Sequence, residues 1–270
     1  PAGVLDPYPD LRLDKCPVKK AIILNKEYTR LEEKLKWIRD KGFDCGFSHH
    51  HNVNFYSEKT NTQFFFIPFA YDENKFSPKE FDDKSIDLSF SGILQNKTEM
   101  SDQSDTRVRV MKELFYCIGD VPVKKRKKYA GLNVRWNSIP RSRFQENIAR
   151  RIGFYRYMSH SEYAEMQSKS KMYLNTLSPA NLVSPRFYEN MASKTLVICE
   201  YSQYVSKVFP SNCYVAFDGS MADFKEKIFY YSKRKLEWDC ITRRAYDFVS
   251  QKHTWCNRAH EIINILTDKS

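Results

Sequence analysis

The chain has 270 residues, enough for two compact α/β domains or for one large domain. With 41% hydrophobic and 29% charged residues its composition is that of a soluble protein, and its longest apolar stretch, from Phe64 to Tyr71, is too short to span a bilayer. The net charge of +11 favours an anionic partner, which is a nucleic acid, an anionic lipid or a phosphorylated small molecule.

The seven cysteines are scattered and form no C-x-x-C pair. This pattern argues against a zinc ribbon or a disulfide framework and predicts reduced thiols. The first ten residues contain no apolar segment of a signal peptide. We therefore expect a cytoplasmic protein without a transmembrane segment in this chain, and we leave open an anchor ahead of Pro1. We interpret the sequon at 96–98 as a chance match.

In the first third of the chain, short apolar strands alternate with an amphipathic helix, the pattern of a parallel α/β protein. The predicted helix covers 28–39, where Leu31, Leu35 and Ile38 recur with helical spacing. The irregular stretch 70–83 predicts a connection between domains. The predicted strands are 21–24, 44–48 and 63–67.

The same alternation continues to the C-terminus. The basic run 124–128, followed by further arginines up to Arg151, is interpreted as a solvated loop beside a basic helix. The predicted strands are 86–94, 131–134, 172–175, 195–199 and 214–217. The predicted helices are 108–115, 161–169, 186–193, 221–235 and about 239–266.

Residues 173–192 combine a strand, a polar loop and the start of a helix. Ser184 suits the N-cap, and Pro185 suits the first helical position. The free N–H groups of such a start carry partial positive charge and bind diphosphates, and Arg186 adds a forked donor for phosphate oxygens. Glu189, nearly one turn further on, can accept hydrogen bonds from a ribose diol. The alternative is an ordinary capped helix with a surface arginine.

Residues 184–198, which read SPRFYENMASKTLVI, resemble the donor-site helix and following strand of GT-B glycosyltransferases of the exostosin-like and group 1 families. Residues 175–198 are also similar to the corresponding loop of fucosyltransferases. Residues 87–92 followed by Arg107 resemble the strand that opens the donor domain, and 254–263 resemble its closing helix. Together the resemblance covers roughly residues 85 to 265.

The resemblance implies a GT-B architecture in the α/β class, with two Rossmann-like domains and a central cleft. We expect an acceptor-side domain at 1–74, which is short for this role and therefore has a reduced sheet. The nucleotide-sugar donor domain is expected at 75–270, with the C-terminal helix at about 239–266 crossing back to the first domain.

The resemblance also assigns roles to individual residues. Gly92 lets the backbone approach the donor phosphates, Arg107 and Arg186 neutralise them, Ser184 binds phosphate and Glu189 binds the ribose. The full set of expected donor nucleotide and diphosphate ligands is Gly92, Arg107, Asn175, Ser184, Pro185, Arg186 and Glu189. The tyrosines that precede the motif are candidates to border the nucleobase, with none preferred: Tyr155, Tyr157 and Tyr163.

Retaining group 1 enzymes usually carry a second glutamate eight residues before the ribose-binding one. In this sequence that position is Asn181, which favours an inverting mechanism. GT-B enzymes generally dispense with a bound metal, so no metal and no cofactor beyond the nucleotide sugar is expected.

An inverting transfer needs a base that takes the acceptor hydroxyl proton. Polar clusters follow the first two predicted strands, at the strand ends where doubly wound sheets bind ligands. The candidate bases are Glu27 and one of His49, His50 and His51. Alternatively, Glu27 is a first-turn glutamate favoured by the helix dipole, and at least one histidine is structural. Three consecutive histidines lack the spacing of zinc motifs.

We therefore predict a glycosyltransferase that moves a hexosyl or pentosyl group from a nucleotide-diphosphate sugar to a hydroxyl of an oligosaccharide or glycoprotein glycan. A UDP-sugar is the first choice of donor and a GDP-sugar the second.

Two alternative functions stay open. One is a basic nucleic-acid-binding protein that uses residues 124–151, although zinc-finger, RNP and zipper motifs are absent, which makes a nucleic-acid partner the less favoured one. The other is a non-catalytic, glycosyltransferase-like sugar-binding protein. A Rossmann dehydrogenase or methyltransferase is disfavoured because G-x-G-x-x-G is absent.

Overall fold

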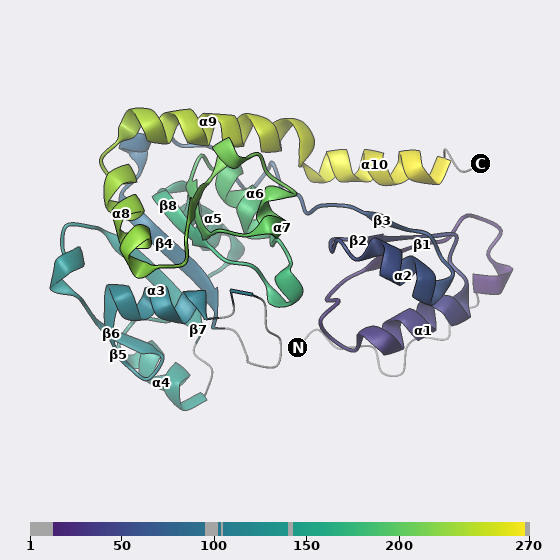
Figure 1. The fold of residues 1–270 in the computed structure, drawn as a ribbon, viewed down its shortest axis with the longest axis horizontal. Helices are drawn as coiled ribbons and strands as arrows, with labels where there is room; N and C mark the ends of the chain where they lie inside the picture. The colour runs from purple at the N-terminus through teal and green to yellow at the C-terminus, as the bar shows by residue number, and fades with distance from the viewer. Residues whose placement is uncertain (1–12, 95–101, 104, 140–142, 268–270) are drawn as a thin grey trace. The chain divides into compact units, whose positions relative to one another are not determined.

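The chain forms two compact units in the computed structural model, and each unit is described here by itself (Figure 1). The first unit contains the residues up to Pro68 together with those from Cys256 onward, and the second runs from Phe69 to Trp255. The residues that the structure describes are 13–94, 102–103, 105–139 and 143–267. Within them, no helix has both the length and the apolar character needed to cross a membrane.

The first unit is built on a parallel sheet of three strands in the order β1-β2-β3. The strands are β1 (Ala21–Leu24), β2 (Cys45–Ser48) and β3 (Phe64–Phe66), and they confirm the three strands predicted from the sequence. Helix α1 (Leu31–Lys41) connects β1 to β2, and α2 (Val53–Thr60) connects β2 to β3. Helix α2 was not predicted from the sequence, because it is only eight residues long and buries a single large apolar side chain.

Both faces of this small sheet are covered. Helices α1 and α2 pack on one face, where the buried residues include Leu35, Ile38 and Tyr56. Helix α10 (Trp255–Thr267) supplies Ile262 and other apolar side chains to the opposite face. Parallel sheets need cover on both faces because their strands are apolar on both sides. The prediction of a reduced Rossmann-like unit at the N-terminal end is confirmed.

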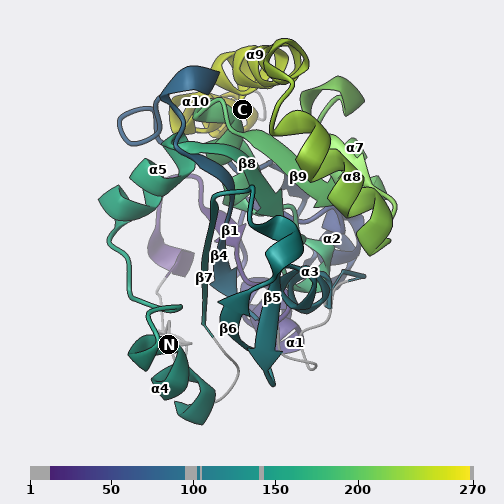
Figure 2. The same ribbon diagram turned by 90° about the vertical axis from the view of Figure 1, so that its left-hand side faces the viewer.

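The second unit contains a parallel sheet of five strands in the order β10-β9-β8-β4-β7. Figure 2 shows β9, β8, β4 and β7 side by side in this order. The strands are β4 (Ile86–Ile93), β7 (Val134–Ile139), β8 (Ser170–Asn175), β9 (Leu196–Glu200) and β10 (Val215–Phe217). From β4 the chain first adds β7 on one side and then returns to add β8 on the other. This reversal between β4 and β8 is the topological switch point, where doubly wound sheets bind their ligands.

Helices cover the two faces of this sheet as well. Helices α3 (Thr106–Leu114) and α8 (Met221–Tyr231) contribute to one apolar core. Helices α6 (Pro185–Ala192) and α9 (Lys235–Lys252) contribute to the other, and α5 (His160–Ser168) packs against α6. Other short elements in the described part of this unit include α7 (Gln203–Ser206) and the 3₁₀ turns Phe81–Asp83, Lys127–Tyr129, Pro179–Asn181 and Ser211–Cys213.

Strand β9 shows how the sequence directs this two-sided packing. Leu196 and Ile198 belong to the core that contains α3 and α8, whereas Val197 and Cys199 belong to the core that contains α6 and α9. Successive side chains of a strand point to opposite faces, so an unbroken apolar run is buried on both sides.

Three predicted segments differ in the structure. The strand predicted at 131–134 is displaced, since only Val134 belongs to a strand, β7, and residues 131–132 lie in a turn and bend after the 3₁₀ turn Lys127–Tyr129. The basic run 124–128 is not a solvated loop, because its first two residues lie in β6 (Val121–Lys125), which pairs with β5 (Phe115–Ile118) in an antiparallel hairpin ahead of α4 (Arg143–Arg151). The single helix predicted at about 239–266 is two helices, α9 and α10. The sequon at 96–98 and Arg141 lie outside the described residues.

The break between α9 and α10 has a clear cause. The backbone N–H of Tyr71 donates to the carbonyl of His253 at 3.1 Å, and the N–H of Trp255 donates to the carbonyl of Tyr71 at 3.3 Å. The segment that enters the second unit therefore takes the hydrogen bonds that a continuous helix would have used.

Candidate functional site

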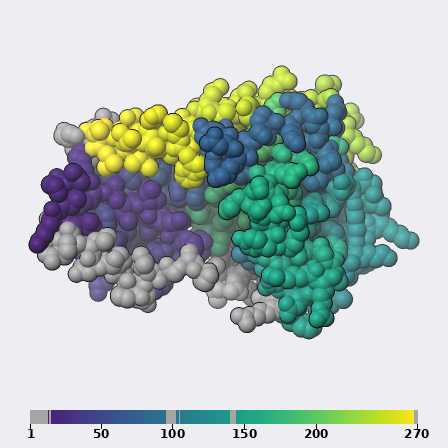
Figure 3. Space-filling model, turned by 180° about the vertical axis from the view of Figure 1, so that it is seen from behind, coloured from purple at the N-terminus to yellow at the C-terminus, as the bar shows by residue number. Residues whose placement is uncertain are grey.

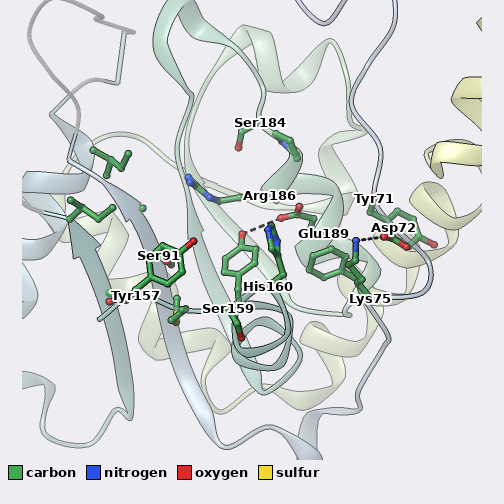
Figure 4. A pocket seen from close by; sticks show the side chains of 18 of the residues that line it. Tyr71, Asp72, Lys75, Ser91, Tyr157, Ser159, His160, Ser184, Arg186 and Glu189 are labelled. Carbon is green, nitrogen blue, oxygen red and sulfur yellow. Dashed lines mark hydrogen bonds and ion pairs between the residues drawn. The ribbon is translucent and has the colours of Figure 1, made fainter. Parts of the chain in front are cut away.

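A pocket of about 650 Å³ lies in the second unit at the carboxyl ends of β4 and β7. The ends of these strands, the loop before α5, the start of α6 and the incoming segment from Ala70 to Phe76 line it. Side chains on its walls include Tyr157, Ser184, Arg186 and Glu189 (Figure 4). This position next to the switch point is where the topology alone predicts a ligand.

Ser184 and Pro185 begin helix α6 as the sequence predicts, with Ser184 at the N-cap and Pro185 at the first helical position. The Ser184 side chain makes no capping hydrogen bond. Its Oγ atom is buried, with Ser184 only 4% exposed, and has no hydrogen-bond partner among the described residues. A buried hydroxyl without a partner costs about 1–3 kcal/mol. A ligand that accepts or donates a hydrogen bond at the helix start would remove this cost.

The Arg186 guanidinium lies over Gly92 at the end of β4. A Cβ atom at position 92 would lie 3.3 Å from Nη1 of Arg186 and 3.2 Å from the ring of Phe90. These distances are shorter than ordinary van der Waals contact, so a larger residue would displace the guanidinium. The structure thus brings Gly92, at the end of β4, together with Ser184 and Arg186 of the helix start.

Glu189 lies one turn along α6 from Arg186 and also faces the pocket. The Tyr163 hydroxyl donates to Oε2 of Glu189 at 3.1 Å, and Nε2 of Gln167 donates to the Tyr163 oxygen at 2.6 Å. Burial raises the pKa of the Glu189 carboxyl, while Tyr163 and Arg186 offset part of this rise. The contact between Tyr163 and Glu189 joins two helices and has no signal in the sequence.

Arg107 and Asn175 lie behind the walls of the pocket rather than among its lining residues. Arg107 is 4% exposed, and it donates through Nε to Oγ1 of Thr176 at 2.6 Å and through Nη1 to the carbonyl of Ile93. Burial and the nearby charge of Arg186 lower the pKa of Arg107 to about 9. Arg107 therefore ties the end of β4 to the loop after β8. Direct contact of Arg107 and Asn175 with a donor stays a prediction.

The segment Ala70–Phe76 supplies pocket residues that the sequence analysis treated only as a connection. Asp72 and Lys75 form an ion pair at 2.6 Å, and both line the pocket. The ring of Phe76 lies 6.4 Å from that of Tyr163 in an edge-to-face arrangement. Figure 3 shows this segment, in blue, on the surface next to the green atoms of α5. The only sequence signal for it was its irregular, charged composition.

The candidate bases belong to the first unit, at the carboxyl edge of its sheet. Oε1 of Glu27 accepts a hydrogen bond from the Ser48 hydroxyl at 2.6 Å, and that hydroxyl accepts one from the backbone N–H of His50 at 2.9 Å. Glu27 is not a first-turn glutamate, because Arg30 adopts a left-handed backbone conformation and α1 begins only after it. The alternative explanation of Glu27 is therefore wrong.

Each of the three histidines has a different environment. Nδ1 of His49 lies 2.8 Å from the carbonyl oxygen of Ile67, and burial lowers the pKa of the His49 ring. Nδ1 of His50 accepts from the backbone N–H of Asn52 at 3.2 Å. The ring of His51 stacks on Phe66 with a centroid separation of 4.3 Å. Which of these residues acts as a base stays a prediction.

Asn181, at the position where retaining relatives carry a glutamate, sits in a tight turn with positive φ angles at Ala180 and Asn181. Its Oδ1 accepts a hydrogen bond from the backbone N–H of Asp102 at 2.7 Å. Within the described ranges, no three His, Cys, Asp or Glu side chains are grouped closely enough to hold a metal ion.

The doubly wound sheet with its switch-point pocket and the smaller parallel unit define a protein of GT-B architecture, as predicted. Residues 108–264 match the model of the family described as glycosyl transferase-like, and the chain therefore belongs to that family. The resemblance to glycosyltransferases of the group 1 type is thereby confirmed. No curated protein sequence matches the chain.

Several solved structures share the fold. The structure of HepE from Anabaena in complex with UDP-glucose has a TM-score of 0.60 and 9% sequence identity, covering 92% of this chain and 72% of HepE. TarM has a TM-score of 0.60 at 14% identity, covering 92% of this chain and 50% of TarM. Sucrose-phosphate synthase from Thermosynechococcus elongatus has a TM-score of 0.57 at 14% identity, covering 91% of this chain and 64% of the synthase.

Proposed function

We propose that the protein is a glycosyltransferase that binds a nucleotide-diphosphate sugar in the pocket of its second unit. The observation that carries this proposal is the buried, unpartnered hydroxyl of Ser184 at the start of α6, beside the Arg186 guanidinium over Gly92. An anion is the ligand that a helix start and a guanidinium favour together. A UDP-sugar is the first choice and a GDP-sugar the second, since HepE was solved with UDP-glucose.

The geometry supports a specific division of roles. The start of α6 and Arg186 stabilise the negative charge that develops on the leaving diphosphate, which is a task that bound metals perform elsewhere. The Glu189 carboxylate accepts hydrogen bonds from the ribose hydroxyls. The hexosyl or pentosyl group is transferred from the donor to the acceptor, which is a hydroxyl of an oligosaccharide or glycoprotein glycan.

We further propose an inverting reaction. The acceptor oxygen bonds to the anomeric carbon as the bond from that carbon to the diphosphate oxygen breaks, and a base takes the acceptor proton. Glu27 and the histidines at 49–51 are the candidates for this base. The amide at Asn181 supports inversion because no carboxylate occupies that position, and its Oδ1 already accepts a backbone hydrogen bond.

A nucleic-acid-binding function has less support. In the basic segment that follows β6, Arg126 donates to the carbonyl of Phe115 and stacks over Tyr116, and Lys128 pairs with Glu113. These cationic side chains therefore already interact with other groups of the protein, which makes them less available to a nucleic acid.

Nucleotide binding is the direct test. We expect UDP or a UDP-sugar to raise the unfolding temperature of the protein, since a ligand at 100 times its Kd adds about 2.7 kcal/mol to the free energy of unfolding. GDP, GDP-sugars and single-stranded RNA serve as the comparison set in the same thermal-shift assay. Stabilisation by RNA alone would reject the enzyme proposal. Binding without sugar transfer to any glycan would favour the non-catalytic sugar-binding alternative.

The raised pKa of Glu189 predicts a pH dependence of nucleotide binding. Only the ionised carboxylate accepts hydrogen bonds from both ribose hydroxyls, and burial raises the pKa of Glu189. The groups that influence this carboxylate are Tyr163 and Gln167, through hydrogen bonds, and Arg186 and His160, through their charges. We expect UDP affinity to fall as the pH is lowered through this raised pKa, at a higher pH than an exposed glutamate would require.

Calorimetric titration of UDP between about pH 5 and pH 8 measures this effect. The matched control is Glu189→Gln, which keeps the shape but cannot ionise and therefore retains only the titration of the nucleotide phosphate. Identical pH profiles for the two proteins would contradict the role of Glu189.

A further inference from the structure

Arg186 and Glu189 are spaced so that they ought to pair with each other. They lie three residues apart on α6, a separation at which opposite charges on a helix are neighbours. Both residues belong to the part of the chain that the structure describes, and no ion pair within 4.0 Å joins their side chains. In Figure 4 the Arg186 side chain extends away from Glu189, on the side of Ser91. Something else must therefore hold the Glu189 carboxylate.

That partner is Tyr163, on the neighbouring helix α5. Its hydroxyl donates to Oε2 of Glu189 at 3.1 Å, and its oxygen accepts from Nε2 of Gln167 at 2.6 Å. A phenol has one proton to donate. Because Nε2 of Gln167 donates to the phenol oxygen, the phenol proton is available to Oε2 of Glu189. The Tyr163 hydroxyl also interacts with the Arg186 guanidinium and with the Tyr173 hydroxyl, so it lies between Arg186 and Glu189.

The hydrogen bonds that join Gln167, Tyr163 and Glu189 are held rigidly at Gln167, and the Glu189 carboxylate at the other end is open to the pocket. Gln167 is fully buried and lies one turn along α5 from Tyr163, so the amide has little freedom to reorient. Burial raises the pKa of the Tyr163 phenol well above its ordinary value, so the phenol keeps its proton. Among the described residues, no donor is directed at Oε1 of Glu189, which leaves that oxygen for a ligand in the pocket.

We propose that Tyr163 is a positioning residue that holds the Glu189 carboxylate apart from Arg186, so that the guanidinium is reserved for the diphosphate and the carboxylate for the ribose hydroxyls. This inference rests on the proposed function. The separation lets each side chain bind a different part of the nucleotide, whereas the two charges would otherwise neutralise each other. It also assigns the substrate class as ribonucleotide sugars in preference to 2′-deoxyribonucleotide sugars.

The test is Tyr163→Phe, with the affinities of UDP, 2′-deoxy-UDP and UMP measured by calorimetry. For the wild type we expect UDP to bind about 10-fold more tightly than 2′-deoxy-UDP, the effect of one good hydrogen bond to a charged group. In Tyr163→Phe we expect this ratio to fall to about 2, because the carboxylate turns toward Arg186. The ratio of UDP to UMP affinity falls as well, since the guanidinium is then partly neutralised.

Two further variants keep the test decisive. Tyr129→Phe is the matched control, because Tyr129 also donates to a carboxylate, Oε1 of Glu113 at 2.5 Å, outside the pocket. It should leave both ratios unchanged. Gln167→Met removes the donor that directs the phenol, and it should lower both ratios in the same direction if Tyr163→Phe does not fold.

The outcomes separate this inference from the proposed function. A wild type that binds none of these nucleotides or their GDP counterparts overturns both. A wild type that binds UDP without preference over 2′-deoxy-UDP overturns only the inference. The inference also fails if the preference persists unchanged in folded Tyr163→Phe and Gln167→Met proteins.

Discussion

Replacing Arg186 by alanine is expected to weaken the binding of UDP roughly 10- to 150-fold, which corresponds to about 1.5–3 kcal/mol for hydrogen bonds to a charged group. The guanidinium lies over Gly92 at the rim of the helix start, where the diphosphate is proposed to bind. Its removal would leave the dipole of α6 and Ser184 as the remaining anion contacts. Isothermal titration of UDP into both proteins measures the change.

Two companion variants sharpen this result. Arg186→Lys keeps the charge but loses the forked donor, so its affinity should lie between those of the wild type and the alanine variant. Arg126→Ala removes an arginine of equal charge at the position directly after β6, outside the pocket, and should leave the affinity unchanged. An Arg186→Ala protein that binds UDP as tightly as the wild type would remove Arg186 from the proposed site.

Replacing Lys84 by methionine is expected to lower the free energy of unfolding by about 2–4 kcal/mol. Lys84 is 4% exposed, and its Nζ donates to the carbonyls of Ser168 at 2.8 Å and Ser193 at 3.1 Å, and to Oγ1 of Thr195 at 3.2 Å. Methionine fills the same space but leaves two buried carbonyls without this donor. Urea denaturation followed by tryptophan fluorescence measures the loss.

The control for this prediction is Lys169→Met on the same side of the unit. Lys169 forms an exposed (i, i+4) ion pair with Glu165, the kind of interaction that contributes only about 0.3–0.5 kcal/mol. Equal destabilisation by both substitutions would show that the buried donor is unimportant. The position of Lys84 also links stability to the site, because Ser168 and Ser193 end the two helices that carry Tyr163 and Glu189.

The strands and the donor helix could be predicted from the sequence because their signals are local. Apolar runs bounded by polar turns mark β4, β8 and β9, and the Ser184–Pro185 cap marks the start of α6. Nothing comparable marks the division of the last helix, which depends on backbone hydrogen bonds to Tyr71, far away in the sequence.

The candidate site was predicted only in part for the same reason. Arg186 and Gly92 were both named, but their contact is a product of the fold. Arg107 has the right charge and helix position for a phosphate ligand, yet Thr176 and Ile93 take up its donors. The sequence shows which hydrogen-bond donors and acceptors are present, but not which donor binds which acceptor in the folded protein.

The backbone hydrogen bonds that join Tyr71 to His253 and Trp255 have a consequence for ligand binding. The segments that enter and leave the second unit are hydrogen-bonded to each other there, and Tyr71 and Trp255 both line the pocket. A ligand in this pocket would lie against the two segments of the chain that join the two units. A ligand whose affinity depends on the conformation of these segments would shift that conformation, by the same free energy by which the conformation changes its affinity.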